Sequence, residues 1–170
     1  MRILCIDQAA RLSGFALFED NKLIEWGTVE PRPRSLTGGP RLKYIYEEFE
    51  KVIDRTKPHQ IVIEDPVGGE EDNRGPKANW KTMFVLANVF GVLELLAANK
   101  NIPIDSVSPS SWQYTCGIHK RDRTSRKAGA EEFVEKQYGV AGTAQDIYDA
   151  ICIGYHYLNK KHQETEISAF

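Results

Sequence analysis

The sequence predicts an α/β fold with a central mixed sheet flanked by helices. Three short apolar runs separated by turns open the chain, which is typical of neighbouring antiparallel strands. Two later apolar runs alternate with segments of helical periodicity, the pattern of parallel strands joined by helices. The sheet is therefore expected to begin with an antiparallel hairpin and to continue with parallel strands. A length of 170 residues fits one domain, residues 1–170, with a sizeable core.

The first predicted strand covers residues 2–7 and ends in an acid, Asp7. Residues 8–14 are predicted as a turn, and residues 15–18 and 22–27 as two more strands joined by a hairpin connection. Asp7 thus lies at the carboxyl end of a buried strand. A carboxylate there either caps a turn through its own backbone or requires a cationic partner, and this strand alone does not decide between the two.

A loop, a helix and a second strand that ends in an acid follow. Residues 30–40 contain three prolines, two glycines and two arginines, which predicts a loop. Apolar residues between 42 and 53 fall on one face at helical spacing, and Pro58 ends this helix. Residues 60–64 form a buried strand that ends in Glu64, and the polar stretch after it is too long for a simple connection.

Residues 80–99 are predicted as a long helix that is apolar on most of its circumference. Such a helix is expected to lie against the sheet or at a subunit contact. Its apolar run from Met83 to Ala98 is interrupted by Asn88 and Glu94, and we expect it to be too short and too polar to span a bilayer. Because no basic-then-apolar signal opens the sequence, the protein is expected in the cytoplasm.

Another strand and two helices are predicted next. Residues 102–107 form the strand, and Pro109 opens a short helix. Thr124 or Ser125 is expected to cap a helix that stops at Gly139. The three cysteines are far apart and have no ligand spacing, so we expect reduced thiols rather than a disulfide or a zinc site. They are Cys5, Cys116 and Cys152.

The last predicted helix begins at a capping-box sequence, residues 143–146, and continues toward Lys160. Asp146 and Asp149 are three residues apart, so both carboxylates project from one face. The helix dipole favours an acid in the first turn, which is enough to explain Asp146. Asp149 has apolar neighbours on both sides, which indicates a helix packed into the protein rather than a solvated acidic face.

A net charge of −2 argues against a purely electrostatic nucleic-acid binder, but the charges are sorted along the chain. Residues 119–127 carry five cations against one anion, a composition that suits a phosphate-binding loop. The alternative is an ordinary solvated surface loop. The five cations are Lys120, Arg121, Arg123, Arg126 and Lys127.

The four acids singled out above suit a metal centre. Two of them end strands of one sheet, and the other two share one face of a helix. Carboxylate oxygens grouped in this way suit Mg²⁺ or Mn²⁺. Two such ions about 4 Å apart would activate a water molecule and stabilise the leaving oxygen in phosphodiester cleavage.

The order of these elements resembles the RuvC family of Holliday junction resolvases, which have an RNase H-like fold. The resemblance extends over nearly the whole chain, and its specific stretches are residues 3–7 with 14–16, residues 61–64 and residues 146–151. It implies an endodeoxyribonuclease that cuts four-way or otherwise branched DNA with two Mg²⁺ or Mn²⁺ ions in each active site. The implied metal ligands are Asp7, Glu64, Asp146 and Asp149.

The resemblance also implies roles for these residues. Asp7 would bridge the two ions, and the other three acids would complete their coordination. Lys127, with Arg126, would meet the charge of the scissile phosphate. Flanking phosphates, which position DNA without reading its sequence, would contact Lys120, Arg121 and Arg123.

Symmetric cutting of a four-way junction requires two active sites, so the resemblance implies a homodimer with the helix of residues 83–98 at its interface. The divergent loops look like those of phage or other mobile-element members, so a bacterial cell or a phage-infected host is expected. A branch-migration motor is a conceivable partner that the sequence does not imply.

The chain departs from the family pattern at two positions. Val67 stands where family members carry a base-stacking phenylalanine, three residues after the acid. Trp80 or Phe84 could substitute, although large aromatics at helical spacing are expected in the core. A basic residue that family members carry after the third long strand falls on Gln113.

Three other functions compete with junction resolution. A ribonuclease H-like or general branched-DNA nuclease would share the four acids and differ in substrate. A junction-binding protein with weak catalysis would not need all four acids. An actin-like sugar kinase or ATPase also has a strand that ends in Asp, but the sequence lacks the second glycine-rich acidic loop, and 170 residues cannot hold two lobes.

Overall fold

The computed structural model describes residues 1–66, 80–119 and 122–167. Strands and helices occur in the predicted order. They are β1 (Arg2–Asp7), β2 (Ser13–Glu19), β3 (Lys22–Val29), α1 (Gly38–Thr56), β4 (Gln60–Glu64), α2 (Trp80–Asn99), β5 (Ile104–Val107), α3 (Pro109–Thr115), α4 (Arg123–Tyr138) and α5 (Gln145–Ile167).

The strands form one mixed sheet in the order β3-β2-β1-β4-β5. β1 pairs antiparallel with β2, and β2 with β3, whereas β1 pairs parallel with β4, and β4 with β5. The central strand β1 thus joins the antiparallel half to the parallel half. The predicted fold class, an α/β mixed sheet with a hairpin followed by parallel strands, is confirmed.

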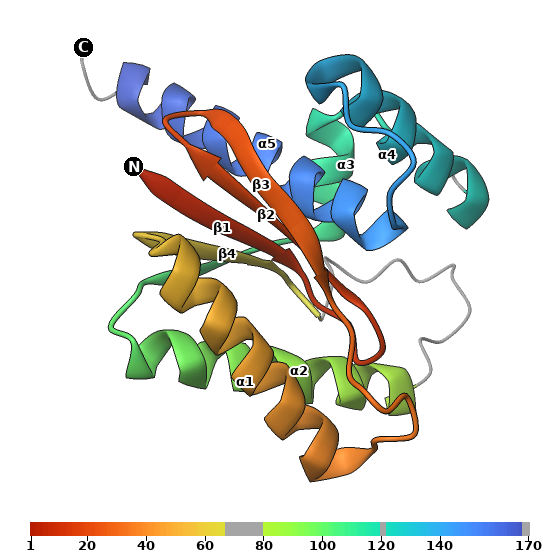
Figure 1. Cartoon of the computed structure of the whole chain (residues 1–170). Coiled ribbons are helices and arrows are strands. Elements are labelled where there is room, and N and C mark those ends of the chain that lie inside the picture. The colour runs from red at the N-terminus through yellow and green to blue at the C-terminus, as the bar shows by residue number, and fades with distance from the viewer. Residues whose placement is uncertain (67–79, 120–121, 168–170) are drawn as a thin grey trace.

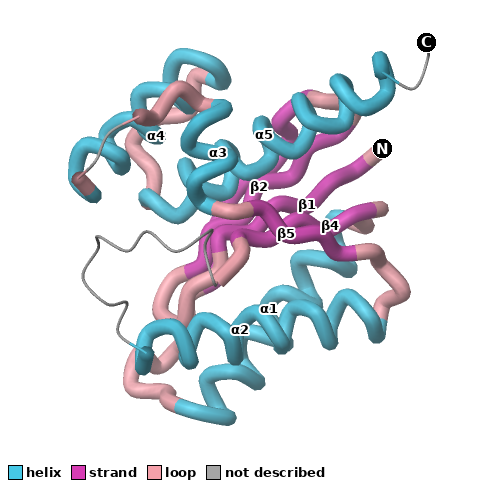
Figure 2. Tube along the Cα trace, turned by 180° about the vertical axis from the view of Figure 1, so that it is seen from behind, coloured by secondary structure: helices cyan, strands magenta, loops and turns pink. Residues whose placement is uncertain are grey.

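Helices cover both faces of the sheet. Figure 1 shows α1 and α2 beneath the sheet and α3, α4 and α5 above it, and Figure 2 shows the same layers from behind. Side chains of β1 alternate between the two layers, with Leu4 and Ile6 in the core between the sheet and helices α1 and α2. Ile3 and Cys5 lie in the other core, against α3, α4 and α5. The three cysteines are buried free thiols, as predicted.

Several helix ends differ from their predictions. α1 begins at Gly38, inside the predicted loop, because proline is tolerated in a first helical turn and Pro40 occupies one. Asp122, rather than Thr124 or Ser125, caps α4, since its carboxylate accepts a 2.8 Å hydrogen bond from the backbone nitrogen of Ser125. α4 ends at Tyr138, and Gly139 forms its C-cap, as predicted.

The predicted capping box at the start of α5 is wrong. α5 begins at Gln145, and the Thr143 hydroxyl donates to the carbonyl of Ala144 instead of capping the helix. Asp146 lies in the first turn, as predicted.

α2 differs from its prediction in its apolar length and in the burial of its aromatic residues. By length and composition alone it could cross a membrane, so the expectation that it is too short and too polar is wrong. Only part of α2 is buried, with Leu93 among the buried residues that pack against α1 and the sheet. Trp80 and Phe84, expected in the core, are 70% and 61% exposed. The apolar circumference of α2 therefore serves a core on one side and an uncovered surface on the other.

The close packing of α5 on the sheet yields a stability prediction. A Cβ atom at Gly154 of α5 would lie 2.2 Å from the ring of Phe18, which is fully buried and has no room to move. Gly154→Ala is therefore expected to lower the free energy of unfolding by about 1–3 kcal/mol, the usual effect of overpacking. The measurement is urea unfolding followed by circular dichroism.

Gly39→Ala is the matched control, because a Cβ there meets nothing within 4 Å in the first turn of α1. It is expected to change the free energy of unfolding by no more than about 1 kcal/mol in either direction, because the helix propensity of alanine is opposed by the crowding of its Cβ against Pro40. Equal stability of Gly154→Ala and wild type would contradict the packing described here.

Candidate active site

The four predicted acids line one pocket of about 310 Å³, here called the acidic pocket. It lies where β1 and β4 end and α5 begins, and α3, α4 and Leu86 of α2 contribute to its walls. The acids come from three segments that are distant in the sequence. They are Asp7, Glu64, Asp146 and Asp149.

Sheet topology brings the first two acids together. Asp7 is the last residue of β1 and Glu64 the last residue of β4. Because these strands are adjacent and parallel, their carboxyl ends meet at the same edge of the sheet. Gly14 on β2 pairs with Asp7 and brings the third segment close, since a Cβ there would lie 1.9 Å from the carbonyl oxygen of Asp146. The first turn of α5 can therefore reach the rim of the sheet.

Neutral side chains orient two of the acids. Trp112 on α3 donates from Nε1 to Oε2 of Glu64 at 3.0 Å. Gln145 donates from Nε2 to Oδ1 of Asp149, also at 3.0 Å. Neither donor carries a charge, so each fixes the direction of a carboxylate without neutralising it.

Gln8 holds the backbone at the ends of both strands. Its side-chain oxygen accepts a 3.1 Å hydrogen bond from the backbone nitrogen of Glu64, and its amide nitrogen donates to the Glu64 carbonyl. Gln8 thereby continues the pairing of β1 with β4 beyond the strand. The side chain is only 5% exposed, so this link is shielded from water.

Sequence reasoning missed these supporting residues. Gln145 and Asp149 are four residues apart in one helix, a spacing that could have revealed their contact. Gln8 follows Asp7 directly, but nothing in the sequence shows that its side chain turns toward β4. No local signal connects Trp112 with Glu64, which precedes it by 48 residues.

Burial and mutual repulsion raise the pKa values of the acids. The pKa of Asp7 is raised well above its usual value by burial and then by the charges of Glu64, Asp149 and Asp146, while Lys127 lowers it. Burial raises the pKa of Glu64 to about 7 and that of Asp149 to about 6. Burial also raises the pKa of Asp146. Asp7 therefore lies within the electrostatic reach of all three other acids.

Three of the five predicted basic residues lie within the described part of the chain. Arg123, Arg126 and Lys127, on the first two turns of α4, line the acidic pocket. Lys127 is exposed, and its charge lowers the pKa values of Asp7, Asp146 and Asp149. Gln113, where family members carry a basic residue, also lines the pocket. Lys120, Arg121 and Val67 lie outside the described residues.

The chemistry of the donors suits a divalent cation. The acidic pocket offers four carboxylates, and oxygen donors are the ligands that Mg²⁺ and Mn²⁺ prefer. Within the described part of the chain, no three acidic, histidine or cysteine side chains already stand at the spacing of a formed metal site. The fit therefore rests on the donor type, the shared pocket and the mutual effects of the carboxylates on their pKa values.

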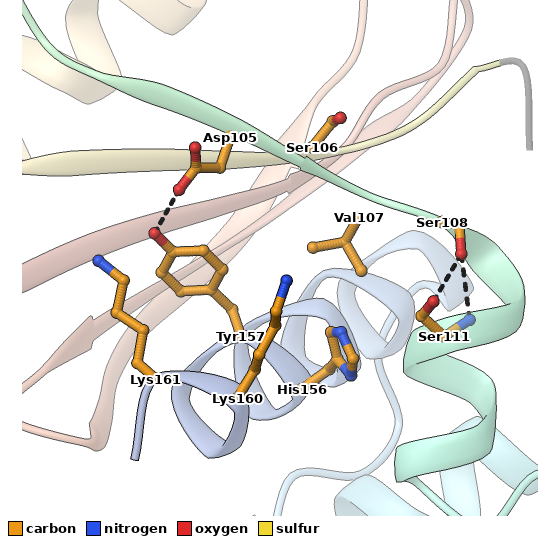
Figure 3. Close-up of a pocket in the computed structure, with 9 residues that line it drawn as sticks. All are labelled: Asp105, Ser106, Val107, Ser108, Ser111, His156, Tyr157, Lys160 and Lys161. Carbon is orange, nitrogen blue, oxygen red and sulfur yellow. Dashed lines mark hydrogen bonds between the residues drawn. The ribbon is translucent and has the colours of Figure 1, made fainter. Parts of the chain in front are cut away.

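A larger cavity of about 510 Å³ lies between β5 and the later turns of α5 (Figure 3). It has one carboxylate, Asp105, which accepts a hydrogen bond of 2.5 Å from the Tyr157 hydroxyl. His156, Lys160 and Lys161 also line it. Because this lining is mainly basic and hydroxylic, the cavity does not suit a divalent cation.

Comparisons with known proteins agree with this architecture. No family model matches the sequence. The crossover junction endodeoxyribonuclease RuvC of Thermotoga maritima is 32% identical over 161 residues, covering 91% of this chain and 89% of that protein. The RuvC of Fusobacterium nucleatum is 26% identical over 165 residues, covering 94% and 80%. The structure of Thermus thermophilus RuvC in complex with a Holliday junction substrate has the same fold, with a TM-score of 0.75, 15% identity and 96% of each chain covered.

The raised pKa values predict how stability depends on pH in the presence of a chelator. A carboxyl with a raised folded pKa favours the folded state at low pH and loses that contribution as the pH rises through the folded pKa. Asp149 titrates at about 6 in the fold, against about 4 in an unfolded chain. Asp149→Asn is therefore expected to be more stable than wild type by about 3 kcal/mol at pH 7.5, with the difference vanishing toward pH 4.

Urea unfolding in EDTA at a series of pH values measures this difference. Asp54→Asn is the control, because its exposed carboxylate accepts from Lys100 and has a lowered pKa. That variant is expected to be less stable than wild type above about pH 4, with the difference vanishing as the pH falls through the folded pKa of Asp54, the opposite sign. A difference between Asp149→Asn and wild type that is the same at pH 5 and pH 8 would contradict the electrostatics of the acidic pocket.

Proposed function

The chain belongs to the RuvC family of crossover junction endodeoxyribonucleases, and we propose that it resolves four-way DNA junctions by metal-dependent hydrolysis in the acidic pocket. One observation carries the assignment to this pocket. β1, β4 and α5, which are far apart in the sequence, contribute four carboxylates to it, next to Lys127 of α4. A cluster of like charges at a sheet rim opposes folding. A function that requires the negative charge therefore explains the cluster better than a role in stability does.

We infer that the pocket holds two Mg²⁺ or Mn²⁺ ions through Asp7, Glu64, Asp146 and Asp149. When bound, the ions would activate the attacking water and stabilise the leaving oxygen. Asp7 is the acid most central to this set, because the other three acids all raise its pKa. Trp112 and Gln145 would hold Glu64 and Asp149 in fixed directions before the ions arrive.

The basic residues of the pocket suit the phosphate. In the reaction a water oxygen attacks the phosphorus and the bond to one sugar oxygen breaks, so negative charge develops on the phosphate and on the leaving oxygen. Lys127 would meet this charge, with Arg126 beside it. Arg123, together with Lys120 and Arg121, would contact flanking phosphates and hold the strand in place.

We further infer the context in which the protein works. Residues 1–170 would act as one nuclease domain, which the two hydrophobic cores on either face of a shared sheet support. Branched DNA in the cytoplasm of a bacterium or of a phage-infected host would be the substrate. No feature of the described residues calls for a branch-migration motor.

The central test is cleavage of a synthetic four-way junction in Mg²⁺. Asp7→Asn and Asp149→Asn are each expected to lower the single-turnover cleavage rate by roughly a hundredfold or more, because each removes a charged metal ligand. Junction binding in EDTA is expected to be retained. Glu132→Gln, an exposed acid on α4 outside the pocket, is the matched control and is expected to cut at the wild-type rate.

The outcomes separate the competing functions. Wild-type rates in both pocket variants would overturn the site assignment. Preferential cutting of linear duplex or of an RNA–DNA hybrid would favour another RNase H-like nuclease. Binding to junctions that is insensitive to chelator, without cutting by wild type, would favour a binding protein that has lost catalysis.

We also propose that α2 forms the interface of a homodimer, which would supply the two active sites that symmetric cutting requires. Trp80, Phe84 and Leu95 fall within about 60° of one another around the helix axis at 100° per residue, and all three are exposed. Gly91 lies in the same stripe and would allow close approach of a second helix. An exposed apolar stripe on a helix whose other side packs into the core is typical of an interface.

A charge in this stripe tests the interface. Leu95, at 57% exposure, contributes to no core, so Leu95→Glu is expected to leave the fold intact. It is expected to weaken dimerisation tenfold or more in sedimentation equilibrium, because a buried charge would lie in the interface. The neighbouring Glu94→Gln is the control and is expected to dimerise as wild type does. A monomeric wild-type protein, or an unaffected Leu95→Glu dimer, would contradict this interface.

A further inference from the structure

A second charged pocket lies next to the acidic pocket and has a different composition. This arginine pocket has a volume of about 410 Å³ and contains Arg11, Arg34 and Arg41. The turn after β1, the connection after β3 and the first turn of α1 form its walls. Its apolar wall consists of small or aliphatic residues, which are Ala10, Leu12 and Pro31.

The pocket carries an excess of positive charge. Its one carboxylate, Glu30, pairs with Arg34 at 2.6 Å and with the adjacent Arg32 at 3.3 Å. Arg41 donates from Nε to the carbonyl of Leu36 at 2.6 Å, which orients its guanidinium without neutralising it. Arg11 is exposed and forms no hydrogen bond or ion pair within the described part of the chain. The three arginines of the pocket and the adjacent Arg32 thus stand against one carboxylate.

Consecutive residues of the turn after β1 line the acidic pocket and the arginine pocket. Gln8 and Ala9 line the acidic pocket, and the next residues, beginning with Ala10, line the arginine pocket. β3 ends at Val29, which pairs with Ser13, at the same edge of the sheet where Asp7 pairs with Gly14. Both pockets therefore lie along one rim of the sheet, with α4 on one face and α1 on the other (Figure 1).

Hydrogen bonds hold this turn in place. The Ser13 hydroxyl accepts from the backbone nitrogen of Ala9 at 2.9 Å and donates to the Ala9 carbonyl at 2.8 Å. Gln8 ties the other end of the turn to Glu64 of β4. The turn that carries Arg11 is thus fixed relative to the acids, and a ligand held by Arg11 would have a defined position next to them.

We propose that the arginine pocket binds a backbone phosphate of the DNA strand that crosses the acidic pocket. The phosphate would lie beside the start of β2 and the end of β3. Guanidinium groups match phosphate oxygens in charge and in planar hydrogen-bonding geometry. The lining contains no aromatic ring on which a base could stack, which favours the backbone over a nucleobase. The strand would then be held on both sides of the acids, by this pocket and by the start of α4. This inference rests on the proposed function, because it assumes that DNA is the ligand of the acidic pocket.

Arg11→Ala tests the inference, because Arg11 is exposed and forms no hydrogen bond or ion pair within the described residues, so its loss is expected to leave the fold intact. In EDTA, by fluorescence anisotropy, the variant is expected to bind a four-way junction three- to tenfold more weakly, roughly the effect of one phosphate contact. The slope of log affinity against log salt is expected to fall by about one. Arg11→Lys is expected to recover most of the slope. Lys136→Ala removes an exposed cation from the far end of α4 and is the matched control, expected to bind as wild type does.

Neutral methylphosphonate linkages placed one at a time around the cutting position locate the contact. In wild type, a neutral linkage at one flanking position is expected to weaken binding by the same factor as Arg11→Ala does. In the Arg11→Ala variant, the linkage at that position is expected to weaken binding no further. Additive losses at every position, or an Arg11→Ala protein with wild-type affinity and salt slope, would overturn the proposal.

Cleavage of the junction in Mg²⁺ tests the proposed function separately. Wild type that binds the junction without cutting contradicts that function, while the binding comparison still decides on the arginine pocket. Wild type that binds no DNA overturns both.

Discussion

The contact between Gly14 and the carbonyl of Asp146 is the packing constraint on which the arrangement of acids depends. A side chain at position 14 would occupy the place of that carbonyl, so only glycine lets the first turn of α5 reach β2. Gly14 pairs with Asp7, and the contact therefore fixes α5 relative to the end of β1. About two turns further along α5, Gly154 makes a similar close approach to Phe18. Backbone packing, rather than attraction between side chains, brings the acids together.

The acids themselves oppose this arrangement. Their raised pKa values mean that the ionised carboxylates disfavour the folded state, and the hydrophobic cores on both faces of the sheet offset that cost. The hydrogen bonds from Trp112 and Gln145 come from neutral donors. A lysine or arginine in either place would lower the pKa of the acid and compete with a metal ion for its charge. The pocket thus orients its carboxylates while keeping their negative charge available to a cation.

The sequence predicted those features that depend on position along a single element. Asp7 and Glu64 could be paired because adjacent parallel strands end at one edge, and Asp146 and Asp149 because their spacing puts them on one helix face. Gln8 and Trp112 could not be assigned, since their partners lie on other elements and the direction of each side chain is set by tertiary packing. Helical periodicity also could not show that Trp80 and Phe84 are exposed, because a core and a subunit interface require the same apolar spacing.

The distribution of charge around the sheet rim links DNA binding to metal binding. A DNA strand approaching four carboxylates is repelled unless cations lie close by. Arginines and Lys127 at the start of α4 line the acidic pocket, and the arginine pocket lies beside the turn after β1. Under the proposed function, these cations would hold phosphates near the acids, where a bound divalent ion would lower the repulsion further. Because each ligand favours the other, a bound strand should raise the affinity for metal by the same factor by which metal raises the affinity for the strand. A net charge of −2 is therefore compatible with DNA binding, since the ratio of positive to negative side chains at the sheet rim differs from the ratio over the whole chain.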